Sequence, residues 1–471
     1  MRNPFSNLRL RTWAACCFAW CAIAHARDGE LDTSFNGTGF QFLPSPYADY
    51  DVQVVGGCID ADDRVLLAAF LYPRSGADEG RDFFIARWLE DGSPDTGFSL
   101  DGQMQVGFAG GFAQGCVVQS DGRILAFGNV LDPPLPPDDL SGMAFARLDA
   151  DGTLDSSFSG DGKAVVDFSL GGEFESAADA LVRADGRIVA AGDARTTTGS
   201  KVAVTRLLSN GTRDDSFDLD GRVSFGFDAG NPAEFATAGA IAEDAQARLL
   251  IAASTDALGS ADFAIVRLLE TGALDASFGD GGKAIVAFDV AGNLHDAATS
   301  LLVQPDGRIV AAGFACAGGS ETSCSTRDIA ILRLDEDGEL DTTFGYGGRR
   351  IFPLDVGSSL DDVAFQVLRQ RDGKLIVTGY TDAGASLGIE CFALRLLADG
   401  RPDTSFGVAG LAIHGYNDGE ATTDYGFRAR LDSQERIVIA GTFAGSDGTL
   451  RGMAIRLTNG DSLFGDGFDA P

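Results

Sequence analysis

Histidine, positive charge and helical periodicity are all scarce in this chain of 471 residues. It has three histidines, and its 36 lysine and arginine residues face 69 aspartate and glutamate residues, which gives a formal net charge of −33. Binding to phosphate depends on clusters of cations, so this balance excludes nucleic acid and anionic lipid as partners. No segment has a convincing apolar period of 3.6 residues, which excludes a helical architecture.

The motifs of common hydrolases are missing as well. Outside the first 26 residues the only histidines are His295 and His414, and they lie in different repeats. The sequence has no HExxH, no GxSxG and no paired histidine spacing for zinc. Each histidine is therefore interpreted as an ordinary loop or strand residue.

Long apolar runs are confined to the start of the chain. Three arginines precede an apolar stretch from Trp13 to Ala24, and Ala24-His25-Ala26 has small residues at the positions that a signal peptidase reads. Residues 1–26 are therefore predicted to be a secretory signal, whose removal takes the formal net charge from −33 to −36 because it removes three arginines. No later stretch approaches about 20 apolar residues, so we expect a secreted protein of the periplasm, cell surface or medium, without membrane insertion.

Five cysteines follow the predicted signal. An exported protein can keep disulfides, and Cys316 and Cys324 flank the polar excursion ACAGGSETSCS, so we predict that they pair. Closing so small a loop would contribute roughly 2.5 kcal/mol in the chain-entropy model. Cys58 and Cys116 fall near equivalent places in adjacent repeats, where a bond between repeats is one alternative, and Cys391 is expected to be buried and free.

What the chain does contain is one phrase, typified by ALDASFGDGG, in seven copies about sixty residues apart. Its phenylalanines are Phe35, Phe98, Phe158, Phe217, Phe278, Phe344 and Phe406. Each copy accompanies four short runs rich in Val, Ile, Leu, Phe and Ala, bounded by Asp and Gly, which is typical of strands and hairpins. We therefore predict an all-β fold, a seven-bladed β-propeller of four-stranded antiparallel blades, as a single domain over residues 27–471.

The two ends of the chain predict how this ring closes. A first strand, at about Gly39 to Leu43, has no three strands before it, whereas the last repeat supplies strands near Thr423–Leu431, Arg436–Phe443 and Gly452–Leu457. If the N-terminal strand joins the C-terminal blade, the sheet is complete and no open edge is left.

The turn between the first two strands differs among the repeats. Four copies have Asp-Gly, whose glycine suits the positive φ of a two-residue hairpin turn. They are Asp121-Gly122, Asp185-Gly186, Asp306-Gly307 and Asp372-Gly373. The other three, Asp62-Asp63, Gln246-Ala247 and Gln434-Glu435, are expected to form looser turns.

An arginine and an aspartate recur in every repeat. The arginines near the end of the third strand are Arg87, Arg147, Arg206, Arg267, Arg333, Arg395 and Arg456. The aspartates of the phrase that follows are Asp32, Asp95, Asp155, Asp214, Asp275, Asp341 and Asp403. A group repeated around a ring is more often a strut that satisfies a buried turn than an active site, so we interpret these pairs as structural.

The phrase LDxSFGxxG, followed by DGRIVAAG and FAIVRL, resembles the delta-60 repeat family of bacterial exported and surface proteins, over essentially all of the chain after the signal. The resemblance implies a β-propeller and implies no reaction, because no catalytic residues are associated with the repeat. Pro94 and Gly97 in the second copy and Arg213 in the fourth depart from the phrase and put the local turn geometry there in question.

One face of the expected ring varies between repeats. The loops between second and third strands, such as YPRSGADEGRD and VLDPPLPPDDLSG, and the crossovers between blades differ in every copy, and such loops are where binding groups usually lie. This face is acidic, and crowded carboxylates can supply the about six to eight oxygens of a calcium site. Its candidate binding residues are Asp78, Glu79, Asp82, Asp138, Asp139, Asp361, Asp362, Asp418, Glu420 and Asp424.

The sequence therefore predicts a secreted, non-catalytic and monomeric scaffold that binds an extracellular protein, a glycan or a cation through its acidic face, with calcium as the candidate cofactor. The alternative is a calcium-dependent hydrolase or lyase that works with carboxylates at the central opening. An enzyme would gather three or more carboxylates close together, whereas a binding module would spread them over the rim.

Overall fold

The computed structural model describes residues 28–459, apart from 75–81, 109, 131–140, 229, 258–260, 289, 291–294, 321–322, 358–360, 385–386 and 417–421. Within these residues the chain forms 28 β-strands and no α-helix, so the predicted all-β class is confirmed. Over the same residues, no helix is long and apolar enough to cross a membrane.

The strands form four-stranded antiparallel units, which we number along the chain. Unit 1 is β2 (Tyr50–Ile59), β3 (Val65–Pro73), β4 (Phe83–Trp88) and β5 (Gln103–Val106). Unit 2 is β6 (Gly111–Val118), β7 (Ile124–Val130), β8 (Gly142–Leu148) and β9 (Lys163–Val166). Unit 3 is β10 (Gly171–Val182), β11 (Ile188–Thr196), β12 (Ser200–Leu207) and β13 (Arg222–Phe225). Unit 4 is β14 (Ala236–Glu243), β15 (Leu249–Thr255), β16 (Asp262–Leu268) and β17 (Lys283–Val286).

The remaining units follow the same order. Unit 5 is β18 (Asp296–Val303), β19 (Ile309–Ser320), β20 (Ser323–Leu334) and β21 (Arg349–Phe352). Unit 6 is β22 (Asp362–Arg369), β23 (Leu375–Asp382), β24 (Gly388–Leu396) and β25 (Leu411–His414). Unit 7 is β26 (Thr422–Leu431), β27 (Ile437–Ala444), β28 (Leu450–Leu457) and β1 (Phe40–Leu43). A short parallel pairing of β24 with β26 joins units 6 and 7 into one eight-stranded sheet.

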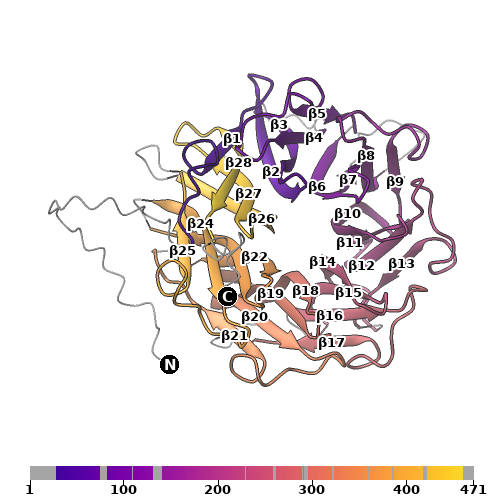
Figure 1. The fold of residues 1–471 in the computed structure, drawn as a ribbon. Coiled ribbons are helices and arrows are strands. Elements are labelled where there is room, and N and C mark those ends of the chain that lie inside the picture. Colours follow the sequence, from indigo (N-terminus) through magenta and orange to yellow (C-terminus); the bar gives the residue numbers. More distant parts are fainter. Residues whose placement is uncertain are drawn as a thin grey trace, which may run out of the picture.

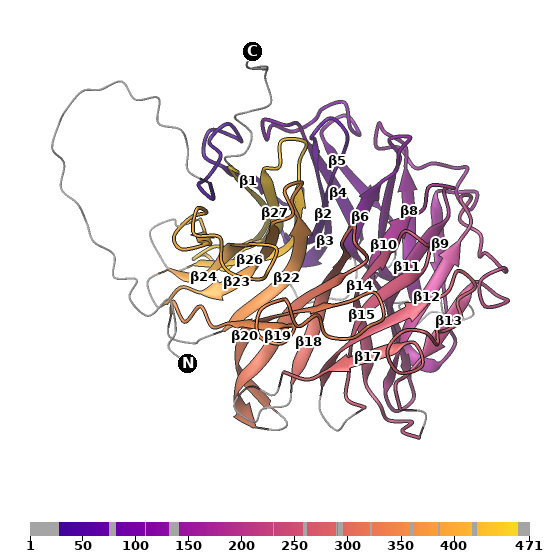
Figure 2. The same cartoon turned by 60° about the horizontal axis from the view of Figure 1, so that its bottom comes forward.

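The units are arranged side by side around a central axis, with the first strand of each unit innermost (Figure 1). The connecting loops lie at the two ends of the strands (Figure 2). We call the end that carries the turns between first and second strands the turn end. The other end, which carries the loops between second and third strands and the connections between units, is the crossover end.

Unit 7 contains both ends of the described chain. β1 pairs antiparallel with β28, with Phe40 opposite Ile455 and Leu43 opposite Gly452. The N-terminal segment therefore supplies the outermost strand of this unit. β1 covers the edge of β28 that would otherwise lack a hydrogen-bonding partner.

Apolar side chains fill the space between neighbouring units, because the strands alternate buried residues between their two faces. One such cluster joins unit 7 to unit 1, where Val438 and Ala440 pack with Val52 and Val54. Six further clusters occupy the other junctions along the chain. The core is thus a series of layers between sheets.

The first turns of all units share one geometry, and the expectation of looser turns without glycine is wrong. Asp63, Ala247 and Glu435 have φ of 58°, 63° and 63°, in the same region as the glycines at the equivalent positions. An Asp–Arg pair such as Asp60 and Arg64 encloses each of these turns: the aspartate accepts bonds from the backbone nitrogen of the arginine at 3.0 Å and from its Nε at 2.6 Å. This local bonding offsets the strain of a side chain at positive φ.

Candidate functional site

The repeated arginines and aspartates are buried struts at the turn end. In every pair the arginine Nε lies 2.7–2.9 Å from the aspartate, and the guanidinium lies 4.6–4.8 Å from the centroid of the repeat's phenylalanine ring. In six pairs the other arm of the arginine donates to a turn carbonyl of the following unit, as Arg87 does to Ala150 at 2.5 Å. The seventh, Arg395, donates to the Asn459 side chain at 2.6 Å. The contacts are those of a structural group that links neighbouring units.

Six of the seven strut carboxyls have a lowered pKa. Burial by itself raises their pKa, but hydrogen bonds from the serine or threonine two residues later and from the arginine outweigh it and hold the pKa below its ordinary value. This applies to Asp32, Asp155, Asp214, Asp275, Asp341 and Asp403.

A second cation on each strut aspartate was not foreseen from the sequence. The residue immediately before the second strand places a cationic nitrogen 3.0–3.9 Å from the same carboxylate. These residues are Arg64, Arg123, Arg187, Arg248, Arg308, Lys374 and Arg436. The signal was present in the sequence, because a basic residue follows the first turn in every repeat.

The strut of unit 7 joins the N-terminal and C-terminal segments of the described chain. Arg456 donates from Nε to Asp32 at 2.7 Å and from Nη1 to the carbonyl of Glu90 in unit 1 at 2.5 Å. Phe35 belongs to the same group, and a Cβ on Gly92 of unit 1 would lie 3.1 Å from its ring. The junction between the last and first units is therefore built like the others.

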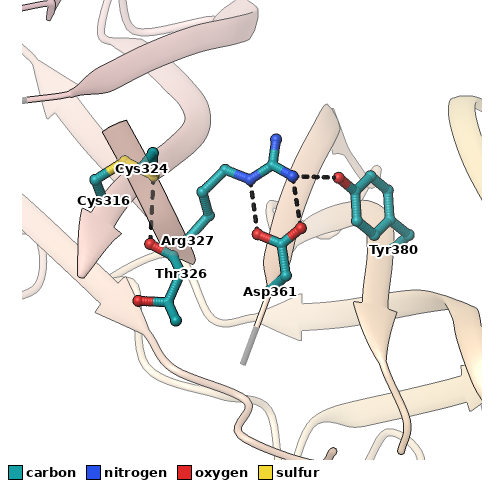
Figure 3. Close-up of a disulfide and its surroundings, with 6 residues drawn as sticks. All are labelled: Cys316, Cys324, Thr326, Arg327, Asp361 and Tyr380. Carbon is teal, nitrogen blue, oxygen red and sulfur yellow. Dashed lines mark hydrogen bonds and ion pairs between the residues drawn. A yellow bond between two sulfur atoms is a disulfide. The ribbon is translucent and has the colours of Figure 1, made fainter. Parts of the chain in front are cut away.

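At the crossover end, four of the ten candidate acids can be placed. Asp361 binds Arg327 with two hydrogen bonds of 2.7 and 2.5 Å, and Arg327 also donates to the Tyr380 hydroxyl at 2.9 Å, beside the disulfide between Cys316 and Cys324 (Figure 3). Asp82 accepts a bond of 2.6 Å from Gln105, and burial raises the pKa of its carboxyl. The remaining two, Asp362 and Asp424, are buried. Asp78, Glu79, Asp138, Asp139, Asp418 and Glu420 lie outside the described residues.

Asp362 and Asp424 belong to a set of buried acids that hold the crossovers. Asp362 accepts the backbone N–H of Leu354 at 2.8 Å, and Asp424 accepts that of Tyr416 at 2.6 Å. Three other crossovers are held in the same way, by Glu175, Glu234 and Asp296. These carboxylates satisfy backbone donors that would otherwise be buried without a partner.

Two of these acids face a second buried acid across the junction between units. Glu390 and Asp424 meet at Gly415. A Cβ atom added to this glycine would lie 1.3 Å from Glu390 Oε2 and 2.6 Å from Asp424 Oδ2, so the two carboxyl oxygens lie close to each other. Burial raises the pKa of Glu390 to about 7. At the preceding junction, burial and the charge of Asp362 raise the pKa of Asp328 to about 7. Each of these junctions therefore holds a proton near neutral pH.

The cysteines and histidines play no part in a shared site among the described residues. The expectation of disulfide bonding is confirmed: a second disulfide joins Cys58 to Cys116, across units 1 and 2, and Cys391 is free and buried. His414 lies 2.7 Å from the carbonyl of Gly29, and burial lowers the pKa of its ring. Where side chains are described, no group of three His, Cys, Asp or Glu could hold a metal ion.

A cavity of about 470 Å³ lies on the central axis, toward the crossover end. The innermost strand of each unit contains a β-bulge near its middle, which inserts one extra residue and turns it toward the axis, and β10 has a second irregularity between Gly171 and Glu175. The extra residues are Val55, Gln114, Ala178, Gly239, Thr299, Phe365 and Phe427, and all of them line the cavity. The bulges therefore determine which side chains line the cavity.

The cavity has aromatic walls and few charges. Phe365 and Phe427 contact each other with ring centroids 5.3 Å apart, and Phe174 lies on another part of the wall. Among the lining residues that the structure describes, Asp193 is the only acid and Arg428 the only base. Burial raises the pKa of Asp193 to about 6 against the opposing charge of Arg195. An apolar pocket with a few polar groups is the usual form of a small-ligand site.

Five segments of the chain match the family model described as a domain of unknown function (DUF5122) beta-propeller. They are residues 119–158, 183–217, 248–278, 304–344 and 370–406. No curated protein matches the chain. Each matched segment contains a strut arginine and the repeat's phenylalanine, and all but 248–278 also contain the first turn.

Several solved structures are similar to the chain. The polysaccharide lyase Uly1 is 10% identical with a TM-score of 0.50, over 88% of this chain and 90% of that chain. A catalytically inactive virginiamycin B lyase from Staphylococcus aureus is 11% identical with a TM-score of 0.44, over 88% and 99% of the two chains. The GH93 alpha-L-arabinofuranosidase of Fusarium graminearum is 10% identical with a TM-score of 0.41, over 91% and 97%. At such identity the likeness to Uly1 shows the fold alone, and together with the five family matches it identifies the chain as a β-propeller repeat protein.

Proposed function

We propose that the protein is a secreted, monomeric and non-catalytic seven-bladed β-propeller that binds a glycan in its central cavity. In this proposal the seven units are the blades, residues 1–26 direct export, and the remaining chain is one domain. The pairing of β1 with β28 and the strut between Arg456 and Asp32 support closure of the ring. The disulfides suggest an oxidising compartment, in keeping with export.

The aromatic lining of the cavity carries this proposal. A sugar ring has apolar faces and hydroxyls at its edge, so it suits a pocket in which phenylalanine faces alternate with hydrogen-bonding groups. Phe174, Phe365 and Phe427 supply the faces, and Ser176 and Asp193 supply acceptors and a donor beside them. A volume of about 470 Å³ lies within the usual range of ligand pockets.

Binding is favoured over catalysis because the acids are dispersed. Asp193 is alone among the described lining residues, and the buried acids at the junctions already accept bonds from the crossovers or share protons. The geometry offers no pair of carboxylates in the cavity for acid and base, within the part of the chain described.

The proposal is tested by screening the mature protein against an array of defined oligosaccharides and measuring each hit by titration calorimetry. We expect Phe365→Ala to weaken binding about 10- to 100-fold, since it removes the buried aromatic contact. Phe225→Ala is the matched control, because Phe225 lies on the outer strand β13. Equal affinities of the two variants, or no bound glycan, would contradict the proposal, and cleavage of a bound glycan would replace it with the hydrolase or lyase alternative.

The acidic crossover end keeps a separate proposal, that of a calcium site. Thermal unfolding after chelation, with and without millimolar Ca²⁺, tests it, because a ligand that binds only the folded state raises the melting temperature. An unchanged melting temperature would remove calcium from the account without affecting the glycan proposal.

A further inference from the structure

The central cavity is closed on one side by an arginine that reaches across the axis. Arg428, on β26 of unit 7, donates from Nη2 to the carbonyl of Ala178 at 2.9 Å and to that of Gly239 at 3.5 Å. These carbonyls belong to β10 and β14, on other units. Both acceptors are bulge residues with small side chains, which leaves room for the guanidinium at the level of the bulges.

A second arginine lies two residues further along the same strand, toward the turn end. Arg430 donates from Nη1 to Gln366 at 3.3 Å, and burial lowers the pKa of its guanidinium, with Asp179 acting in the opposite direction. Arg428 and Arg430 both line a small space between units 7 and 1. A ligand that enters from the crossover end therefore meets Arg428 as the floor and does not pass through.

Among the described residues, no acidic side chain pairs with Arg428. Its described bonds use one nitrogen and end on neutral carbonyls. By contrast, every strut arginine binds an aspartate. An arginine fork with unused donors in an enclosed pocket is suited to a carboxylate, which it can bind through two parallel hydrogen bonds.

We propose that the cavity binds the acidic end of a glycan chain, a terminal uronic acid whose carboxylate contacts Arg428. This inference rests on the proposed glycan binding. It adds the class of sugar that binds and which end of the glycan chain enters the cavity. The sugar ring then lies against Phe365 and Phe427, and its hydroxyls are within the pocket that Asp193 lines. Because Arg428 closes the floor, the ligand presents a chain end rather than an internal segment.

The test uses two disaccharides that differ in one group. The first is an aldobiouronic acid with glucuronic acid at its non-reducing end, and the second is its carboxyl-reduced, neutral twin. Titration calorimetry at pH 7.5 should give at least about tenfold tighter binding of the acid, the scale of one charge-assisted hydrogen bond. Arg428→Gln should weaken the acid about 10- to 100-fold and the twin less than about twofold.

Two further variants make the result specific. Arg428→Lys keeps the charge without the fork and should retain part of the preference for the acid. Arg451→Gln removes the same charge from an exposed residue that pairs with Asp447, and should leave both affinities unchanged. The glutamine side chain can still donate to the carbonyls that Arg428 bonds, and melting temperatures check that each variant is folded.

Equal affinities for the two disaccharides, equal weakening of both by Arg428→Gln, or no binding of either would overturn the acidic-end inference. Glycan binding itself would stand in those cases if an array hit depends on Phe365. Failure of the inference and failure of the proposed function are therefore seen in different measurements.

Discussion

Each junction between units has different contacts at the turn end and at the crossover end. At the turn end every junction carries the same buried arginine, aspartate and phenylalanine, in one geometry. At the crossover end the residues differ: Asp328 faces Asp362 and Glu390 faces Asp424. The equivalent positions in the other units hold Asp82, Gly142, Lys201, Asp262 and Arg451. Uniformity at one end holds the sheets in register, and this leaves the other end free to vary in its loops and in the groups near the cavity.

The largest effect should come from breaking a strut at the turn end. Asp32→Ala would leave the buried Arg456 and the adjacent Arg436 without their shared carboxylate, at a cost of about 3–5 kcal/mol in the free energy of unfolding. Asp155→Ala removes the same contacts from a strut whose partners are eight residues apart in sequence. Denaturant unfolding should show Asp32→Ala to be the more destabilised of the two, since it also loosens β1, and equal losses would show that the junction between the chain ends has no special weight.

A change at the crossover end should depend on pH. The pKa of Glu390 is raised to about 7 in the folded protein by burial, above the ordinary value of 4.5, so its contribution to stability is greatest below pH 4.5 and is lost as the pH rises through 7. Glu390→Gln, which stays neutral, should therefore gain roughly 1–3 kcal/mol over the wild type at pH 8 and nothing at pH 4. Chemical denaturation at both pH values measures this, and a difference that does not change with pH would contradict it.

Binding should also respond to pH through the cavity. Burial raises the pKa of Asp193 to about 6, and its ionised carboxylate accepts stronger hydrogen bonds from sugar hydroxyls than the protonated carboxyl group does. For a glycan found on the array, affinity should fall several-fold, up to about tenfold, as the pH is lowered from 7.5 to 5. Asp193→Asn should bind weakly at both pH values, and a wild type without pH dependence would place the ligand away from Asp193.

The smallest effect should come from the outer cation of a strut. Arg308 lies 3.0 Å from Asp341, but its side chain is 42% exposed, so Arg308→Ala should cost no more than about 1 kcal/mol. Arg333→Ala, at the buried cation of the same aspartate, should cost several times as much. Comparable decreases in melting temperature for the two variants would show that both cations stabilise the strut equally.

The sequence predicted the parts of the fold that repeat. The spacing of the phenylalanines and the apolar runs gave the all-β class, because strand periodicity and turn residues are local signals. The prediction for the turns at Asp63, Ala247 and Glu435 was wrong. In these turns hydrogen bonds between an aspartate and an arginine stabilise the positive φ that glycine adopts in the other repeats.

The cavity could not be predicted, for a physical reason. A β-bulge shifts the alternation of a strand by one residue, and nothing in the sequence distinguishes Phe365 or Phe427 from the neighbours that face the core. The acids predicted to bind a ligand failed for a different reason, because two of them are buried and already hydrogen-bonded. Asp362 and Asp424 are next to variable loops in sequence, yet they lie at or near the start of inner strands and accept hydrogen bonds from the backbone of the crossovers.

The pairing of β1 with β28 also has a consequence for the time course of folding. Phe35 and Asp32 are made first and meet Arg456 across a separation of 424 residues, which a ribosome takes on the order of 20–90 s to synthesise. Until then the strand edge of β1 has no partner, and such long-range contacts form slowly. A chain cut short before β28 would therefore retain β1 as an unpaired strand edge, which favours association with other chains.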